Sequence, residues 1–475
     1  MIFILNLVPS QKFQNEYFLV THMGYDCIVV GAGTGGTTAA RTLALKGHKV
    51  LIIDRKKKEV VGDKVCGDAI GKHYFDTLNK LIGLRYPTKD ECEANIDGID
   101  VISPDKETIL KIQGEGIKGY MINRLKFGQR LLNATIDTGV EFIDNTSVIS
   151  PVYEGEYVAG VLTRSLESGE KKEIRGKVII DASGVNAVIR RKLRNSSVER
   201  TVQNEDVIVC FREIRDLNHE IEDPNFCKIY LTQSISPGGY VWVFPESITR
   251  VNVGLGVQNI PNNPHPRKQL YTYVLQDALF EESTIVHKGG GFVPTRRPIW
   301  SQVTNGLLIV GDAACQVNPI HGGGIGPSMM GGYLAATNVD RALEKGDLSE
   351  RGLWEYNIDY MKEYGAKQAG LDIFRLFLQH TPDDELNYGM KHRLLKEEDI
   401  LSASLGDDLV LNITEKVKRL FSGIGKLGLL NRLRKISSKM KEIKGLFQNY
   451  PSPEKLEAWK TEVESIYTET FEILK

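Results

Sequence analysis

The sequence has no apolar run long enough to cross a membrane and almost no net charge. No stretch approaches the roughly 18 consecutive apolar residues that a spanning helix needs, so we expect no transmembrane segment. Lys and Arg (60) nearly cancel Asp and Glu (61), so bulk charge gives no reason to expect nucleic acid as a partner. Internal repeats and low-complexity linkers are missing too, and the hydrophobic (41%) and charged (25%) shares exclude a disordered or fibrous chain.

Cysteine is sparse and scattered. The six thiols show neither a C-x-x-C pair nor a spacing with histidine that suits zinc, which predicts no metal site and no disulfide framework of a secreted protein. A reducing cytoplasm is therefore the expected compartment. The apolar start at residues 1–8 has no basic region before it and no cleavage site after it. We expect residues 1–23 to be a disordered extension rather than a signal peptide.

Glycine, by contrast, is abundant, with 46 residues that cluster where a backbone must approach something closely. The first cluster, G-A-G-T-G-G, follows a β-rich apolar run at Tyr25–Val30 and precedes a helical stretch at Thr37–Lys46. In such a unit Gly31 permits the tight turn, Gly33 lets the backbone close on a pyrophosphate, and Gly36 lets the helix pack near the strand. The order of strand, turn and helix predicts a dinucleotide site.

The second strand strengthens that prediction. Residues Lys49–Ile53 form another apolar run that ends in Asp54, 23 residues beyond Gly31. A carboxylate at this distance can accept both ribose hydroxyls of an adenosine. Because an acid here disfavours a 2′-phosphate, the nucleotide is expected to be FAD or NAD rather than NADP.

Two further segments predict that the nucleotide domain is assembled from distant pieces. Gly306–Ala314 (G-L-L-I-V-G-D-A-A) is an apolar strand that runs into Asp312 and is followed by a glycine-rich turn. Asp312 suits the ribityl or pyrophosphate side of a long dinucleotide, and the amides around Gly324 and Ile325 suit its ring. Lys177–Gly184 (K-V-I-I-D-A-S-G) supplies a third strand with a sharp exit.

Three such pieces, separated in this way, resemble the flavoproteins of the p-hydroxybenzoate hydroxylase fold, which implies FAD as the cofactor. Other motifs narrow the resemblance: V-G-D-K-V-C-G-D-A at Val61–Ala69, S-P-G-G-Y-V-W-V-F-P with a downstream G-L-G at Ser236–Gly256, and H-K-G-G-G-F-V-P-T-R-R-P at His287–Pro298. Together with E-Y-G-A-K-Q-A-G-L-D-I-F-R at Glu363–Arg375, these motifs are similar to those of the archaeal geranylgeranyl reductases, the digeranylgeranylglycerophospholipid reductase family, almost from end to end.

The resemblance implies an α/β fold, α+β overall, in three parts. A Rossmann-like FAD-binding domain of the p-hydroxybenzoate hydroxylase type is expected over 24–95, 119–190 and 299–345. An antiparallel-sheet substrate domain is intercalated over 96–118 and 191–298, and a C-terminal helical domain covers 346–475. The positions that the family's motifs place at FAD are Gly36, Asp54, Cys66, Gly67, Ala69, Arg124, Val148, Asp312, Gly324 and Ile325.

The aromatic motif predicts that three rings line one face of a sheet. Tyr240, Trp242 and Phe244 alternate along one strand, so their rings project from the same face of a sheet. Taken alone, the pattern also fits an ordinary core strand. The resemblance favours a substrate cavity for an isoprenoid tail.

The reaction that the resemblance implies needs an acid. An isolated trisubstituted alkene is not polarised toward hydride, so hydride transfer must be matched by a proton at the less substituted carbon. Cys66, in the loop expected at the flavin, is the first candidate donor and His321 the second; a buried structural thiol and a loop-anchoring histidine are the alternatives. Arg296 and Arg297 are candidates for a diphosphate or phospholipid headgroup, or else for ordinary salt bridges.

We therefore expect an FAD-dependent reductase that hydrogenates the C=C bonds of geranylgeranyl diphosphate or of digeranylgeranyl glycerophospholipids. A flavin-dependent monooxygenase of the same fold and a non-catalytic prenyl-binding carrier are the rivals. A second nucleotide fingerprint is missing, which leaves NADPH and reduced ferredoxin open as electron donors. Residues 413–450 hold ten Lys or Arg against two Glu, interleaved with apolar residues. This stretch is either a peripheral membrane contact or the solvated face of covering helices.

Overall fold

Distant strands form one mixed sheet, the nucleotide sheet, in the computed structural model, which describes residues 20–194, 196–398, 400 and 427–475. Its path runs β17-β18-β11-β1-β2-β8, and β9 and β10 extend it from β11. The pairs β1–β2, β1–β11, β2–β8 and β11–β18 are parallel, so the carboxyl ends of all three predicted pieces meet at one edge. The strands are β1 Val20–Val30, β2 Val50–Ile53, β8 Glu141–Ile143, β9 Thr146–Glu154, β10 Tyr157–Ser165, β11 Lys171–Asp181, β17 Val303–Thr304 and β18 Leu307–Ile309.

Both faces of the nucleotide sheet are covered, which explains why β2, β18 and the last residues of β1 and β11 are apolar runs. Helices α1 (Thr34–Leu45) and α5 (Ile325–Lys345) pack on one face, and α3 (Arg124–Ile136) lies against α1. The β9–β10 hairpin and the chain after β11 cover the other face. The start of β1 corrects one prediction: residues 20–23, expected in a disordered extension, belong to the strand, while 1–19 lie outside the described residues.

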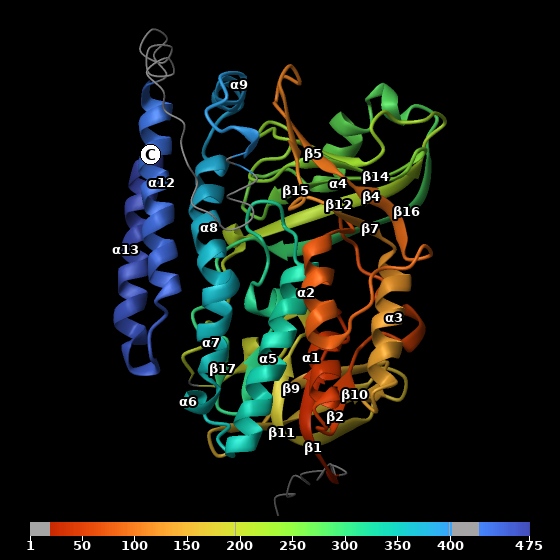
Figure 1. The fold of residues 1–475 in the computed structure, drawn as a ribbon, viewed down its shortest axis with the longest axis vertical. Helices are drawn as coiled ribbons and strands as arrows, with labels where there is room; N and C mark the ends of the chain where they lie inside the picture. The colour runs from red at the N-terminus through yellow and green to blue at the C-terminus, as the bar shows by residue number, and fades with distance from the viewer. Residues whose placement is uncertain (1–19, 195, 399, 401–426) are drawn as a thin grey trace, which may run out of the picture.

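A second sheet, the substrate sheet, has the order β16-β12-β15-β14-β13-β5-β6 and is antiparallel except for the pair β13–β5. One face packs on α4 and η5 (Pro266–Gln269, Leu270–Val274). The other face meets a three-stranded sheet, β3-β7-β4, that joins it to α2, α3 and α5 (Figure 1). The strands are β3 Ala69–Gly71, β4 Cys92–Ile96, β5 Gly98–Ile102, β6 Ile109–Gln113, β7 Gly119–Ile122, β12 Val207–Asp216, β13 Phe226–Tyr230, β14 Val241–Ser247, β15 Arg250–Gln258 and β16 Thr284–Pro294, and α2 spans Lys72–Ile82.

The C-terminal part is helical, and three of its helices stand side by side along one flank (Figure 1). The described part of the predicted basic amphipathic stretch is α12, whose apolar residues, such as Ile436 and Ile443, are buried against α8 and α13. In this part the apolar face therefore covers the protein and not a membrane, and residues 413–426 lie outside the described residues. None of the described helices is long and apolar enough to cross a bilayer. The helices are α6 Glu350–Leu353, α7 Glu355–Tyr360, α8 Ala366–Gln379, α9 Asp383–Lys391, α12 Leu427–Gln448 and α13 Leu456–Leu474.

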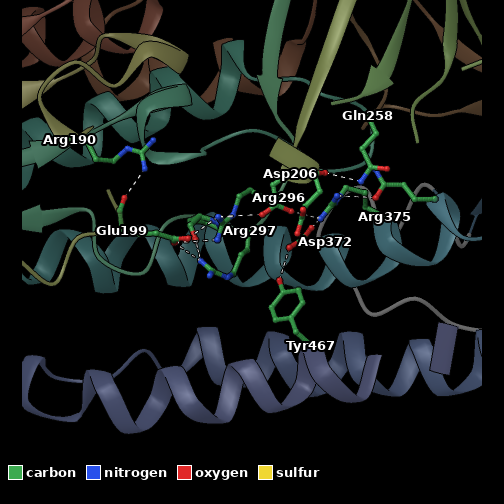
Figure 2. A network of polar contacts seen from close by, with 12 residues as sticks. Arg190, Glu199, Asp206, Gln258, Arg296, Arg297, Asp372, Arg375 and Tyr467 are labelled. Carbon is green, nitrogen blue, oxygen red and sulfur yellow. Dashed lines mark hydrogen bonds and ion pairs between the residues drawn. The ribbon is translucent and has the colours of Figure 1, made fainter. Parts of the chain in front are cut away.

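A buried charge network joins the parts of the chain (Figure 2). Glu199, in the segment that leads from the nucleotide sheet to the substrate sheet, pairs with Arg296 at 2.8 Å and with Arg297 at 3.2 Å. Arg375 of α8 continues the network to Asp206 at 3.0 Å and to Asp372 at 2.8 Å. These ion pairs link the segment that holds Glu199 to the residues after β16 and to α8. The Tyr467 hydroxyl donates to Asp372 at 2.6 Å and so adds helix α13 to the network.

This network corrects the headgroup prediction for Arg296 and Arg297. Both side chains are buried and already paired with Glu199, and Arg296 also pairs with Asp206 at 3.4 Å. The Arg297 guanidinium lies 3.1 Å from the ring centre of Trp300. A free diphosphate or phospholipid headgroup has no access to them. The ordinary salt-bridge alternative is the one that the structure supports.

We predict that Glu199→Gln lowers the free energy of unfolding by about 3–5 kcal/mol at neutral pH, because it leaves buried guanidiniums uncompensated. Burial alone raises the pKa of Glu199, but Arg297 and Arg296 outweigh burial and hold it at about 2, against an ordinary 4.5. Its stabilising contribution is therefore complete above about 4.5 and is lost as the pH falls toward 2. Urea denaturation across this range should show a shallower acid decline for the variant than for the native chain.

Glu115→Gln is the matched control, because Glu115 is exposed and its ion pair among the described residues is with exposed Lys118. An exposed pair contributes about 0–1 kcal/mol. Equal losses of stability in the two variants would contradict the role given to the network.

Candidate functional site

The glycine turn after β1 has the geometry expected of a dinucleotide site. Gly31 has φ +106°, and a Cβ there would lie 2.5 Å from the Ala182 carbonyl oxygen. A Cβ on Gly36 would lie 1.9 Å from the Gly31 oxygen, so α1 can approach β1 only with glycine at this position. A Cβ on Gly33, in contrast, would meet no atom within 4 Å. The N-terminus of α1 therefore presents an open glycine surface that suits a pyrophosphate.

Asp54 is held beside that turn at the end of β2. Its Oδ2 accepts a hydrogen bond from the Ala32 amide at 2.7 Å, and its Oδ1 accepts one from the Lys56 amide at 2.8 Å. A carboxylate has about four acceptor sites, so capacity remains for ribose hydroxyls. The Asp54 carbonyl also accepts from Thr146 at 2.9 Å, which places the start of β9 here. Val148 follows in β9 with its side chain in the hydrophobic core.

The side chain of Arg124 shows whether the predicted site suits the phosphate groups of a dinucleotide. It is the first residue of α3, after the N-cap Asn123. Its Nε and Nη1 atoms are buried without a hydrogen-bond partner among the described residues. Buried unsatisfied guanidinium donors are costly. They fit the phosphate groups of a dinucleotide, which is the role that the motif predicts.

Asp312 contacts both the loop at Val61–Ala69, through Lys64, and the glycine-rich turn that contains Gly324. Its Oδ2 pairs with Lys64 at 2.8 Å, and Asp312 raises the pKa of that lysine. A Cβ on Gly324 would lie 3.2 Å from Asp312 Oδ1, and Ile325 opens α5. The predicted residues of both segments are therefore brought together, with the N-terminus of a long helix facing the same region.

The substrate sheet presents its aromatic residues on one face, as predicted. The ring centres of Tyr240 and Trp242 are 6.0 Å apart, and those of Trp242 and Phe244 are 6.3 Å apart. Trp242 lies opposite Gly254 in the register, where a Cβ would meet the indole Cζ2 at 2.5 Å. The first glycine of G-L-G thus makes room for the tryptophan ring. Sequence reasoning identified both parts of this motif but not their contact.

The loop that holds Cys66 lies against this face. A Cβ on Gly67 would be 3.1 Å from the Phe244 ring, and one on Gly289 of β16 would be 2.5 Å from Val65. Cys66 itself is half-buried, and Ala69, at the start of β3, packs against the hydrophobic cluster that contains Trp242 and Phe244. The predicted loop and the predicted aromatic wall are therefore neighbours in space.

Sequence reasoning missed the polar residues that join the loop to the sheet. Asn252 accepts from Trp242 Nε1 at 2.9 Å and donates to the Cys66 carbonyl at 2.9 Å and to Asp68 Oδ2 at 2.8 Å. Arg212 also donates to the Cys66 carbonyl, at 3.3 Å, and contacts His287 Nδ1 at 2.8 Å. Asn252 stands two residues before Gly254, so its place on the aromatic face could have been found from strand alternation.

The two candidate acids differ in their environment. Burial, together with Asp68, raises the pKa of the Cys66 thiol, which keeps it protonated at neutral pH. Desolvation and then the charge of Lys367 lower the pKa of His321, although its side chain is exposed. The His321 Nδ1 accepts from Gly323 at 3.1 Å, and its carbonyl accepts from Tyr240 at 2.7 Å. His321 is thus neutral and suits loop anchoring better than proton donation.

Two family models match this chain, one over most of the substrate sheet and one over much of the nucleotide sheet. The model of the geranylgeranyl reductase catalytic domain matches residues 206–293, and that of glucose inhibited division protein A matches 26–204. The chain is 41% identical to digeranylgeranylglycerophospholipid reductase of Sulfolobus acidocaldarius over 94% of its own length and 98% of the relative's. It is 31% identical to the enzyme of that name from Methanothrix thermoacetophila over 79% and 93%.

Solved structures share the fold at low identity. A geranylgeranyl bacteriochlorophyll reductase-like protein of Thermoplasma acidophilum has a TM-score of 0.73 at 23% identity, covering 88% of this chain and 99% of that one. The myxobacterial FAD-dependent halogenase of chondrochloren synthesis has a TM-score of 0.60 at 20% identity, covering 91% and 99%.

Fold and site together define an FAD-dependent oxidoreductase, a flavoprotein with a substrate sheet set on its nucleotide sheet. Within that class, the chain belongs to the digeranylgeranylglycerophospholipid reductase family. This membership favours a reductase over the monooxygenase and carrier rivals, and the cofactor is FAD.

We predict that Asp54→Ala weakens FAD retention about tenfold or more, because a charge-assisted hydrogen bond contributes roughly 1.5–3 kcal/mol and each 1.4 kcal/mol is a factor of ten. Flavin absorbance after dialysis measures the loss. Asp26→Ala is the control, because Asp26 lies within β1, before the glycine turn, and its bonds in the described part of the chain are to Lys49 and Lys177. Equal flavin contents in the two variants would reject the ribose assignment.

Proposed function

We propose that this protein hydrogenates the C=C bonds of geranylgeranyl chains, carried by digeranylgeranyl glycerophospholipids or by geranylgeranyl diphosphate. The observation that carries the proposal is the aromatic face, Tyr240, Trp242 and Phe244, set directly against the Cys66 loop. The relatives named above are called digeranylgeranylglycerophospholipid reductases, which supports the lipid as substrate. A long apolar chain laid along these rings would be held out of water beside a neutral thiol.

The residues of the chain have distinct tasks in this proposal. The Gly33 surface, Asp54, Arg124 and Asp312 hold FAD, which supplies the hydride when bound and reduced. The aromatic face positions the alkene and excludes water. Cys66 holds the proton that the less substituted carbon receives, because its raised pKa keeps the sulfur protonated.

The proposal also covers two further partners, the electron donor and the membrane surface. The described residues contain one glycine turn of the dinucleotide type, so NADPH or a reduced ferredoxin would meet the protein transiently rather than occupy a second such site. Arg434, Lys435 and Lys441 are exposed on α12, while most of its apolar residues are buried and Leu427 at its start is exposed. A contact of this helix with anionic lipid would therefore be electrostatic and weaken with salt.

Trp242→Ala is expected to reduce geranylgeranyl turnover on the order of tenfold or more while flavin content stays close to that of the native chain, because the indole positions the substrate and not the cofactor. Trp242→Phe should recover part of the rate. Added hydrogens are counted by mass spectrometry after anaerobic incubation with dithionite. Phe211→Ala is the matched control, because Phe211 packs on the opposite face of the substrate sheet. Flavin loss that tracks activity loss in Trp242→Ala would refute the substrate wall.

Cys66→Ala should leave FAD bound and reducible by dithionite while alkene saturation slows on the order of 10² or more, the usual effect of removing a positioned acid. Cys66→Ser should recover little, because a hydroxyl is a weaker acid than a thiol. Single-turnover rates of the reduced protein with geranylgeranyl diphosphate test this. Cys92→Ala, which removes a half-buried thiol in β4, is the control. A Cys66→Ala rate near that of the native chain would move the acid elsewhere.

A further inference from the structure

Asp68 occupies an unusual position beside Cys66. It follows Cys66 and Gly67 directly, and its φ of +64° lies in the left-handed region that residues other than glycine rarely adopt. The residue is 4% exposed, and its charge is among the causes that raise the pKa of the Cys66 thiol. The left-handed turn therefore directs the chain so that a carboxyl group is buried next to the thiol.

The Asp68 carboxyl group is only half satisfied. Oδ2 accepts from Asn252 at 2.8 Å, whereas Oδ1 is buried without a hydrogen-bond partner among the described residues. The nearest cation, Arg212, is 3.7 Å from Oδ2, too far for a hydrogen bond, and its guanidinium also contacts His287. A buried carboxylate in these surroundings lacks the donors that an ionised form needs. A carboxylic acid, with one oxygen protonated, suits the site better.

The charges around Asp68 agree with a protonated form. Burial raises the pKa of Asp68 to about 7 against the lowering effect of Arg212 and Arg124. Burial, and then Asp68 itself, raise the pKa of Glu246 in β14 to about 8. The titratable and charged groups that face Asp68 are Arg212 of β12, with His287 of β16 behind it, Arg124 of α3, Glu246 of β14, and Asp63 and Cys66 in its own loop.

We infer that Asp68 is the proton reservoir of the site, a positioning residue whose carboxylic acid restores the proton of the Cys66 thiol between reductions. The inference rests on the proposed function. In each cycle the Cys66 S–H bond breaks as a C–H bond forms on the less substituted alkene carbon, and the hydrogen of the second C–H bond is the hydride that reduced FAD would supply. The Asp68 O–H proton then passes to the thiolate, and solvent returns a proton to the Asp68 carboxylate.

Asp68→Asn isolates this role. Asparagine tolerates positive φ as well as aspartate does, and its side-chain oxygen can still accept the hydrogen bond from Asn252. The substitution therefore keeps the turn and the contact with the substrate sheet and removes only the proton that titrates. Asp63→Asn makes the same chemical change at an exposed position of the same loop and is the matched control.

The holoenzyme should show a split between first and later turnovers. In Asp68→Asn the thiol begins protonated, so the single-turnover rate should remain within a few-fold of the native rate, while steady-state turnover falls on the order of 10². In the native chain steady-state turnover should fall as the pH rises through about 7, where Asp68 loses its proton, and this inflection should be missing in the variant. Equal slowing of both rates, or a native steady-state rate in the variant, would overturn the inference.

A second measurement needs no turnover. Ionised Asp68 raises the pKa of the neighbouring thiol, so alkylation of Cys66 by iodoacetamide should begin at lower pH in Asp68→Asn than in the native chain or in Asp63→Asn. Identical alkylation profiles in all three proteins would overturn the coupling of Asp68 to Cys66. A native protein that alkylates as expected but saturates no geranylgeranyl chain would instead refute the proposed function and leave the coupling intact.

Discussion

The side chain of Asn252 is the contact on which the arrangement of the site depends. One amide group fixes Trp242 in the substrate sheet, the carbonyl of Cys66 and the carboxyl group of Asp68. Trp242 belongs to the substrate sheet, whereas Cys66 and Asp68 lie in the loop before β3, and no other described contact joins all three. Because Asn252 is fully buried, a loss of any one of its bonds would leave an unsatisfied amide at a cost of about 1–3 kcal/mol. The cofactor side and the substrate side are therefore positioned by the same few atoms.

Glycine allows this approach on the side of the substrate sheet. Gly254 leaves room for the indole of Trp242, and Gly289 leaves room for Val65 in the loop. Side chains at these positions would hold the loop away from the aromatic face. The glycines of the two sheets thus make room for different groups: Gly36 lets α1 approach β1, whereas Gly254 admits the Trp242 ring and Gly289 admits Val65 of the loop.

Much of the fold was accessible from the sequence because strand, turn and helix patterns are local. The pieces around Gly31, Asp54 and Asp312 could be joined because each ends an apolar strand, and the alternation of Tyr240, Trp242 and Phe244 correctly predicted a shared face. Local patterns do not show which distant residue a side chain will contact in the folded protein. Arg296 and Arg297 look like an anion site until Glu199, almost a hundred residues earlier, is found against them. Asn252 and Asp68 carry no motif of their own and become visible only when the sheets are packed.

The interleaving of the two sheets has a consequence for how the chain is made. Strand β18 completes the nucleotide sheet beside β11, yet every strand from β12 to β16 is synthesised between them. The ribosome therefore releases a substrate sheet before the nucleotide sheet has its last parallel strand, and the edge of β11 stays open in the meantime. The proposed cofactor residues Asp54 and Asp312 come from opposite sides of this gap in the chain, so the proposed site is complete only after α5 has emerged. Binding of FAD at that site would for this reason follow the synthesis of most of the chain.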